Sequence, residues 1–176
     1  MSLATMHDEP PHIQRLIDAL GMRYLEGESG YYALRQSSAF RIEVDDEELP
    51  AHSSIYYLLT RRYPINYLHW LASEDIHILV DGGPLDYYLF LESGDVAHVR
   101  LGRDLSNGEI PAVTVPARSY KAILLPEHIE YALLVNVLTP AWAPDRVRVG
   151  AGVEFMNSFV GRAEWATERF LHRLLP

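Results

Sequence analysis

The chain has 176 residues and contains no cysteine. Disulfide frameworks, catalytic thiols and thiolate metal sites are therefore excluded. The absence of cysteine fits a reducing compartment, and we expect a cytoplasmic protein.

Basic residues and long apolar runs are scarce as well. Fifteen Lys and Arg stand against 24 Asp and Glu, which gives a formal net charge of −9. This balance argues against a nucleic-acid partner, because phosphate contacts need clustered basic side chains, and against an anionic membrane surface. The longest apolar runs, such as 55–59 and 131–135, fall far short of the roughly 18 residues of a membrane span. We expect neither nucleic acid nor membrane as a partner.

Tyrosine is the residue type in excess, with 11 Tyr against five Phe. A tyrosine places a large apolar ring and one hydroxyl at the same position, whereas phenylalanine would suffice for core volume alone. The excess directs attention to where the tyrosines lie.

Turn residues divide the middle of the chain into short runs of strand-forming residues. Many short strands at this spacing predict a sandwich or barrel. The predicted strands cover 31–36, 53–60, 67–71, 76–80, 85–91, 96–101, 112–115, 120–125 and 131–138.

Helical periodicity marks both ends of the chain. Apolar residues at i, i+3, i+4 and i+7 predict a helix over 11–21, and a similar stripe predicts a C-terminal helix over about 159–175. We therefore predict one all-β domain over 1–176, with a β-barrel over about 31–150 and a short helix at either end.

The residues with the clearest potential for catalysis or metal binding lie in the segment 67–77. The chain has no G-x-S-x-G, Walker, G-x-G-x-x-G or H-E-x-x-H motif. His69 is instead followed by the carboxylates Glu74 and Asp75. Imidazole and carboxylate together can hold a divalent metal or serve as an acid–base pair.

This block resembles the first motif of the cupins, G-x5-H-x-H-x3,4-E-x6-G. His69 falls on the second His, Glu74 fits the carboxylate, and Asp75 with the six residues before Gly82 fits the end of the motif; Tyr67 takes the place of the first His. A broader resemblance, to the fifth cupin family, runs from about residue 13 to 175. It rests on the segments 26–32, 53–59, 73–85, 115–121 and 131–134.

The resemblance implies a double-stranded β-helix, the RmlC-like jelly-roll barrel, and a homodimer with the stretch 56–59 and the terminal helices as candidate faces. It also exposes departures in the metal ligands. Ile78 stands where the family has a histidine, with His77 expected on the opposite face of the strand, and Lys121 stands at the second-motif ligand position. We expect no cofactor; a divalent metal, if bound, would have His69, Glu74 and Asp75 as ligands.

Motif matching and strand phase together predict a polar lining for the barrel. The candidate catalytic residues are His69, Asp75, Tyr120 and Lys121. The candidate ligand-binding residues are Glu26, Tyr32, Arg35, Tyr56, Tyr88 and Asn136.

Three functions remain open at this level. The first is a pocket protein that binds a small polar ligand, sugar-like or anionic. The second is a metal-independent isomerase or epimerase, in which His69, held by Asp75, is the base and Tyr120 or Lys121 the acid. The third is a metal-dependent cupin enzyme. The fold alone does not separate them.

Overall fold

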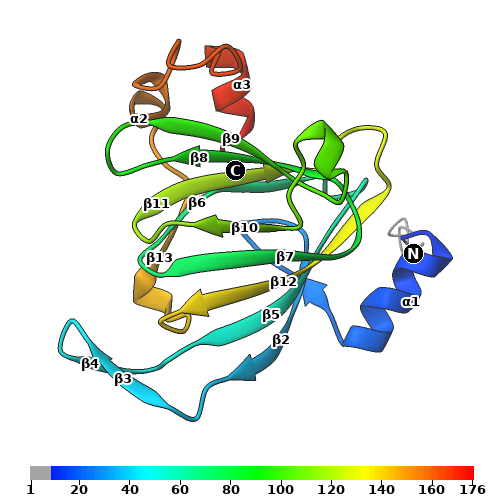
Figure 1. Ribbon diagram of the computed structural model, residues 1–176, viewed down its shortest axis with the longest axis vertical. Coiled ribbons are helices and arrows are strands. Elements are labelled where there is room, and N and C mark those ends of the chain that lie inside the picture. Colours follow the sequence, from blue (N-terminus) through cyan, green and yellow to red (C-terminus); the bar gives the residue numbers. More distant parts are fainter. Residues whose placement is uncertain (1–8) are drawn as a thin grey trace, which may run out of the picture.

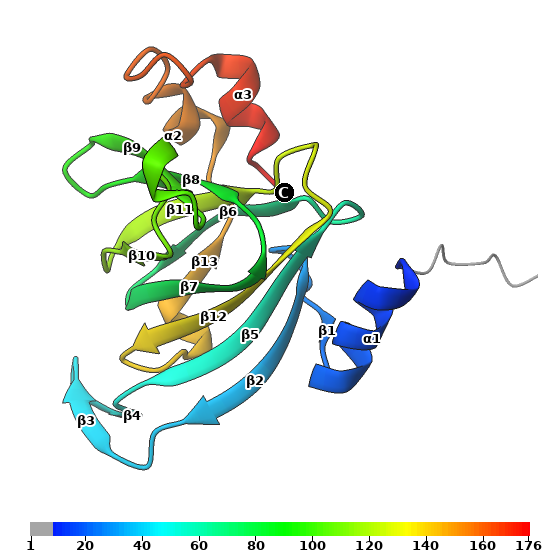
Figure 2. The same cartoon turned by 45° about the vertical axis from the view of Figure 1, so that its right-hand side comes forward.

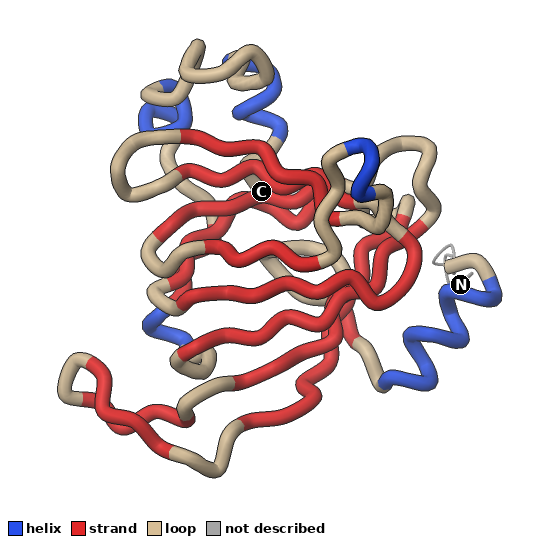
Figure 3. The backbone as a smooth tube through the Cα atoms, viewed as in Figure 1, coloured by secondary structure: helices blue, strands red, loops and turns tan. Residues whose placement is uncertain are grey.

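Two curved antiparallel sheets form the body of the protein in the computed structural model, which describes residues 9–176 (Figure 1). The six-stranded sheet has the order β1 (Arg23–Tyr24), β2 (Tyr31–Ser37), β5 (Ser53–Thr60), β12 (Tyr131–Thr139), β7 (Glu74–Gly82) and β10 (Ala112–Val115). The five-stranded sheet has the order β13 (Val147–Val149), β6 (Ile65–Leu71), β11 (Ser119–Leu124), β8 (Leu85–Phe90) and β9 (Val96–Leu101). Figure 3 shows how strands account for most of the body.

The main core lies between these two sheets. Tyr57 and Leu134 of the six-stranded sheet pack in one cluster with Tyr87 and Ile123 of the five-stranded sheet, and all four are at most 2% exposed. Successive strand residues face opposite sides, so every second residue of these strands enters this interior. The predicted all-β jelly roll with short helices at its ends is confirmed.

The N-terminal helix α1 (Pro11–Leu20) agrees with the helix predicted over 11–21. Ile13 and Ile17 are buried against Leu58 and Leu133 of the six-stranded sheet, on the side away from the main core. Gly21 ends the helix in a left-handed conformation with φ of 62°, which glycine adopts without steric cost.

The C-terminal segment differs from the single helix predicted over 159–175. It forms two short helices, α2 (Val153–Asn157) and α3 (Glu168–Arg173), joined by a turn in which Gly161 has φ of 79°. Thr167 starts α3 as an N-cap that accepts a hydrogen bond from the Phe170 amide. The apolar periodicity of the segment therefore reflects two pieces that pack separately on Leu68 and Phe90, which face outward from the five-stranded sheet. Figure 2 shows both helices on the same side of the barrel.

The stretch 56–59 is not free to form a dimer face. Tyr57, Leu58 and Leu59 are between 0% and 2% exposed within one chain. They lie on β5 between β2 and β12, where one face meets the core and the other meets α1. The homodimer itself stays a prediction.

Two smaller features complete the fold. The stretch 41–50, which carries several Asp and Glu residues, forms a hairpin of β3 (Arg41–Val44) and β4 (Glu47–Pro50) that projects from the body (Figures 1 and 2). Short 3-10 helices lie at Leu105–Asn107 and Pro144–Arg146. No helix within residues 9–176 is long and apolar enough to cross a membrane.

Arg118 stores backbone strain in the turn between β10 and β11. Its φ is 61°, a left-handed conformation that costs a non-glycine residue roughly 1–2 kcal/mol. We expect Arg118→Gly to raise the free energy of unfolding by about 0.5–1 kcal/mol, since relief of strain exceeds the entropy cost of glycine. Urea unfolding measures the change.

Ala117→Gly is the matched control, because Ala117 has a negative φ. It should lower the free energy of unfolding by about 0.5–1 kcal/mol. A destabilised Arg118→Gly protein would contradict the strain argument.

Candidate functional site

A cavity of about 500 Å³ opens between the two sheets. Its walls come from β2, β5, β7 and β12 on one side and from β6, β11 and β13 on the other. The loop that connects β1 with β2 closes part of it through Leu25, Glu26 and Glu28.

Cross-strand pairing gathers the polar side chains of the cavity. Lys121 lies opposite His69 in the β11–β6 pair, and Asn136 lies opposite His77 in the β12–β7 pair. Residues opposite each other share a face of the sheet, so each sheet presents a pair of polar residues to the interior. Asp75, two residues before His77 on β7, lies on that same face.

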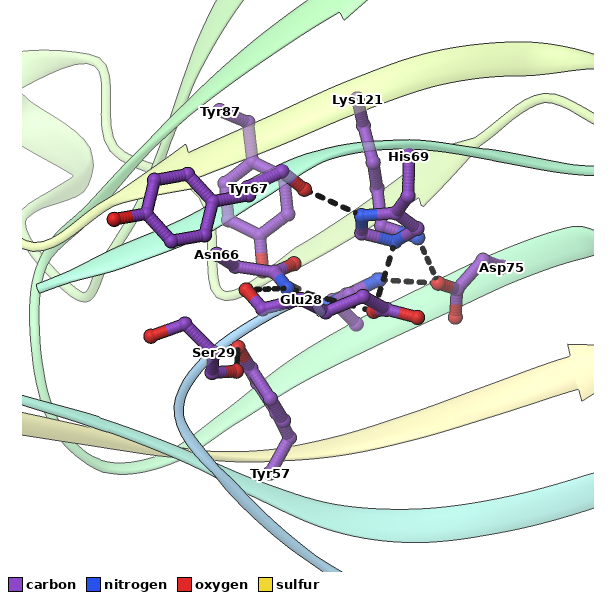
Figure 4. A network of polar contacts seen from close by, with 10 residues as sticks. Glu28, Ser29, Tyr57, Asn66, Tyr67, His69, Asp75, Tyr87 and Lys121 are labelled. Carbon is purple, nitrogen blue, oxygen red and sulfur yellow. Dashed lines mark hydrogen bonds and ion pairs between the residues drawn. The ribbon is translucent and has the colours of Figure 1, made fainter. Parts of the chain in front are cut away.

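An ion pair lies at the centre of this polar group. Lys121 Nζ donates to Asp75 Oδ2 over 2.5 Å (Figure 4). The same oxygen accepts from His77 Nε2 over 2.6 Å, and the Tyr87 hydroxyl donates to His77 Nδ1 over 3.0 Å. All four side chains are at most 2% exposed, so the network is shielded from bulk water.

The network keeps Asp75 ionised and His77 neutral. Burial alone would raise the pKa of Asp75, but the hydrogen bonds from His77 and Lys121 together with the Lys121 charge outweigh it and hold the pKa well below its ordinary value. Burial lowers the pKa of His77 by more than the neighbouring carboxylate raises it. His77 therefore fixes the position of Asp75 and adds no positive charge to the cavity.

His69 presents an unprotonated nitrogen. Its Nδ1 lies 2.8 Å from the backbone carbonyl of Tyr67, and since a carbonyl only accepts, Nδ1 carries the proton. Burial lowers the pKa of His69, with the Glu28 carboxylate opposing. Nε2 is thus left as an acceptor, 3.5 Å from Glu28 Oε2.

The β1–β2 loop is anchored from both sheets. Asn66 Nδ2 donates to the Glu28 carbonyl over 3.2 Å, and the Tyr57 hydroxyl donates to the Ser29 carbonyl over 2.7 Å. A Cβ on Gly30 would lie 2.6 Å from that hydroxyl, a distance that Cβ atoms do not adopt. Glycine at this position therefore allows the loop to approach Tyr57 and to deliver Glu28 to the cavity (Figure 4).

Two buried acceptors in the cavity wall have no hydrogen-bond partner within residues 9–176. They are Asp75 Oδ1 and Asn136 Oδ1, whose side chains are 2% and 8% exposed. A buried polar atom without a partner costs about 1–3 kcal/mol. Such atoms mark places where a donor from outside the chain would be stabilised.

The structure brings six of the predicted site residues to the cavity. The lining includes Glu26, Tyr32, His69, Asp75, Lys121 and Asn136.

The other five predicted site residues are absent from this lining. They are Arg35, Tyr56, Glu74, Tyr88 and Tyr120.

Strand alternation explains why three predicted tyrosines face outward. Tyr120 is next to Lys121 and packs on Phe155 with the ring centroids 4.7 Å apart. Tyr88 packs against Trp165 of the C-terminal segment. Tyr56 packs with the cluster of α1. Motif matching found the right segments but assigned these three tyrosines to the wrong face of their strands.

Glu74 and Arg35 are displaced for similar reasons. Glu74 immediately precedes Asp75 on β7 and is exposed. Arg35 lies at a shift in register between β2 and β5 and is also exposed, with its guanidinium 3.4 Å from the Gln36 side chain.

His77 lies on the opposite face of the strand from Ile78, as expected, but this is the face that turns toward the site. His77 is fully buried beside Asp75, whereas Ile78 is 42% exposed. The signal was present in the sequence, because Asp75 and His77 are two apart on one strand and must share a face. Glu28, Tyr57, Asn66 and Tyr87 were also missed, and the first of these depends on a loop that no periodicity marks.

Comparison with known proteins identifies the family of this chain. A family model described as Cupin superfamily (DUF985), Cupin_5, matches residues 14–149. The chain belongs to this cupin family. The resemblance found in the sequence is thereby confirmed.

One relative and two solved structures show how far the similarity of this cupin extends; the relative is described as uncharacterised and one of the structures as hypothetical. The protein YML079W of Saccharomyces cerevisiae is 30% identical over 181 residues, which cover 94% of this cupin and 89% of the yeast protein. A hypothetical protein from Leishmania major has a TM-score of 0.77 at 19% identity, covering 89% of this cupin and 96% of that chain. Protein SO0799 from Shewanella oneidensis has a TM-score of 0.76 at 20% identity, covering 93% and 96%. At these identities the two structures show the fold alone.

The cavity of this cupin does not fit a divalent metal. Among residues 9–176 no group of three or more His, Asp or Glu side chains is placed to hold one. The Lys121 ammonium lies against Asp75, where it would repel a cation, and Glu74 points to solvent. A two-ligand set of His69 and Asp75 falls short of the three or four protein ligands of a typical transition-metal site.

The burial of neutral His69 predicts a loss of stability in acid. The unfolded imidazole takes up a proton near pH 6.5, whereas burial lowers the pKa of the folded one. Below that pH the unfolded state binds more protons, so the free energy of unfolding should fall by up to about 1.4 kcal/mol per pH unit for this group. Urea unfolding between pH 7.5 and 5 measures the slope.

In His69→Gln the free energy of unfolding should depend less steeply on pH, because the contribution of one titrating group is lost. His77 and other groups should account for the slope that remains. His128→Gln is the control, because His128 is exposed. Equal slopes in His69→Gln and the unchanged protein would show that His69 does not titrate differently on folding.

Proposed function

We propose that this cupin binds a small polar molecule, sugar-like or anionic, in the cavity between its sheets. The observation that carries the proposal is the pair of unpartnered acceptors, Asp75 Oδ1 and Asn136 Oδ1, in the wall of a cavity of about 500 Å³. This volume lies in the range of small-molecule sites, which combine apolar walls with a few placed polar groups.

The polar residues of the cavity are costly for the fold alone. A buried ion pair is often no more stabilising than well-packed apolar residues of similar volume. Lys121 and Asp75 form such a pair, and His69 adds a third buried polar side chain. Retaining this set beside an open cavity is understandable if it contacts a ligand.

Thermal-shift screening tests the proposal. We expect at least one compound in a panel of sugars, sugar nucleotides and organic acids to raise the melting temperature, because a ligand present at 100 times its Kd adds about 2.7 kcal/mol to stability. Asn136→Leu removes an unpartnered acceptor and should abolish most of that shift.

The control variant is Tyr120→Phe, whose ring lies on the outer face. It should keep the full shift. A panel that leaves the melting temperature unchanged, or a shift that survives in Asn136→Leu, would contradict binding at this cavity.

The second candidate is a metal-independent isomerase or epimerase. The observation that favours it is the presence in one cavity of a neutral imidazole with Nε2 free to accept a proton and of the Lys121 ammonium. The residue roles in this candidate differ from those expected from the sequence. His69 is oriented by the Tyr67 carbonyl rather than by Asp75, and Asp75 instead orients Lys121. Tyr120 lies on the outer face of its strand and therefore does not serve as the acid.

Proton exchange distinguishes this candidate from a pure binding protein. For a ligand found in the screen, we expect deuterium from solvent to enter a C–H bond, as followed by NMR. His69→Gln should stop the exchange and retain binding, whereas His128→Gln should retain both the exchange and the binding. Wild-type exchange in His69→Gln would eliminate His69 as the base.

A further inference from the structure

We infer that the ligand of this cavity carries a neutral hydroxyl-bearing head joined to an apolar body, and that it is not an anion. The inference rests on the proposed binding function and narrows it to one chemical class. Three features of the cavity carry it: the type of unsatisfied polar atom, the balance of charge, and the separation of polar and apolar walls.

The buried side-chain atoms of the cavity wall that have no hydrogen-bond partner among the described residues are acceptors. Asp75 Oδ1 and Asn136 Oδ1 have no donor in the described part of the chain. His69 Nε2 is also an acceptor, because the proton of this ring lies on Nδ1. An ionised carboxylate or a fully ionised phosphate group offers only acceptor oxygens and would leave these atoms unsatisfied. A ligand with O–H donors would satisfy them.

The charge of the cavity also disfavours an anion. Its described lining contains two basic residues, Arg23 and Lys121, and three carboxylates, Glu26, Glu28 and Asp75. The buried cation is already matched by Asp75 at 2.5 Å. An anion would therefore enter a site with a surplus of negative charge in surroundings of low dielectric, where repulsion is strong.

A hydroxyl fits the Lys121–Asp75 pair better than an amine does. Lys121 has three N–H donors, and one of them is directed at Asp75 Oδ2. A ligand hydroxyl can accept from Lys121 and donate to Asp75 at once. An ammonium group would satisfy the carboxylate but would face the Lys121 charge at short range.

The apolar part of the ligand is indicated by the remaining walls. Ile55, Leu71, Leu138 and Val147 line the same cavity as the polar group. Leu34 and Trp142 also belong to the lining and are 69% and 53% exposed. Large apolar side chains left exposed beside a concave site are typical of surfaces that a ligand covers.

Calorimetric titration with matched compounds tests the inference. The reference probe is phenyl β-glucopyranoside. Phenyl β-glucuronide carries a carboxylate in place of its hydroxymethyl group, and glucose lacks its phenyl group. A fourth probe, 3-phenoxypropane-1,2-diol, is a neutral diol without the sugar ring. We expect at least one neutral phenyl compound to bind, and the glucuronide and glucose to bind about tenfold more weakly or worse, the cost of roughly one unsatisfied polar contact or one lost apolar contact.

Two variants locate the contacts. Trp142→Ala should weaken the binding of the neutral phenyl compound about tenfold and leave the binding of glucose unchanged, whereas Asn136→Leu should weaken the binding of both. Tyr120→Phe should weaken neither.

The outcomes separate the inference from the function beneath it. One contradicting result is that the glucuronide or organic acids bind as tightly as the neutral compounds and lose affinity in Asn136→Leu. This result would overturn the inference that the ligand is neutral and would leave the proposed binding function intact. Glucose that binds as tightly as the phenyl glucoside would overturn the apolar part. No binding by any neutral or anionic probe would overturn both the inference and the binding function.

Discussion

The ion pair between Lys121 and Asp75 is the constraint around which the interior of this protein is arranged. It joins the two sheets at a point where both side chains are 2% exposed. A buried pair is tolerable only where further hydrogen bonds satisfy the charges, and His77, backed by Tyr87, supplies one of them. The same arrangement leaves Asp75 Oδ1 without a partner among the described residues, so the pair links the two sheets and at the same time leaves an acceptor unsatisfied.

The pair also changes what the cupin barrel can do at this position. The positions of Asp75 and Lys121 correspond to metal-ligand positions in the general cupin motifs that the sequence resembles, and here an ammonium group occupies the space beside the carboxylate. A lysine next to Asp75 provides a fixed positive charge that is matched locally. The chemistry that remains is hydrogen bonding and proton transfer, with neutral His69 as acceptor and Lys121 as donor. Apolar walls around this small polar group favour a ligand with two chemically different ends.

The sequence allowed the all-β fold, the N-terminal helix and the family to be predicted, because turn residues and periodicity are local properties. It also allowed His69, Asp75 and Lys121 to be placed in one site, through motif spacing. It failed at Tyr56, Tyr88 and Tyr120, where a shift of one residue reverses the face of a strand. The C-terminal helix was overextended, because two separately packed helices repeat the apolar spacing of one long helix.

The sequence by itself therefore determined the nine strands β2 and β5–β12 and the chemical groups they carry, whereas the short strands β1, β3, β4 and β13 appeared only in the structure. Tertiary structure alone decided which groups meet. Besides His77 on its own strand, Asp75 pairs with Lys121, 46 positions away, rather than with the nearby His69. Glu28 reaches the cavity on a loop held by Tyr57 and Asn66. The reason is that contacts between sheets depend on strand register and on the path of connecting loops. Both are settled by packing of the whole barrel rather than by neighbours along the chain.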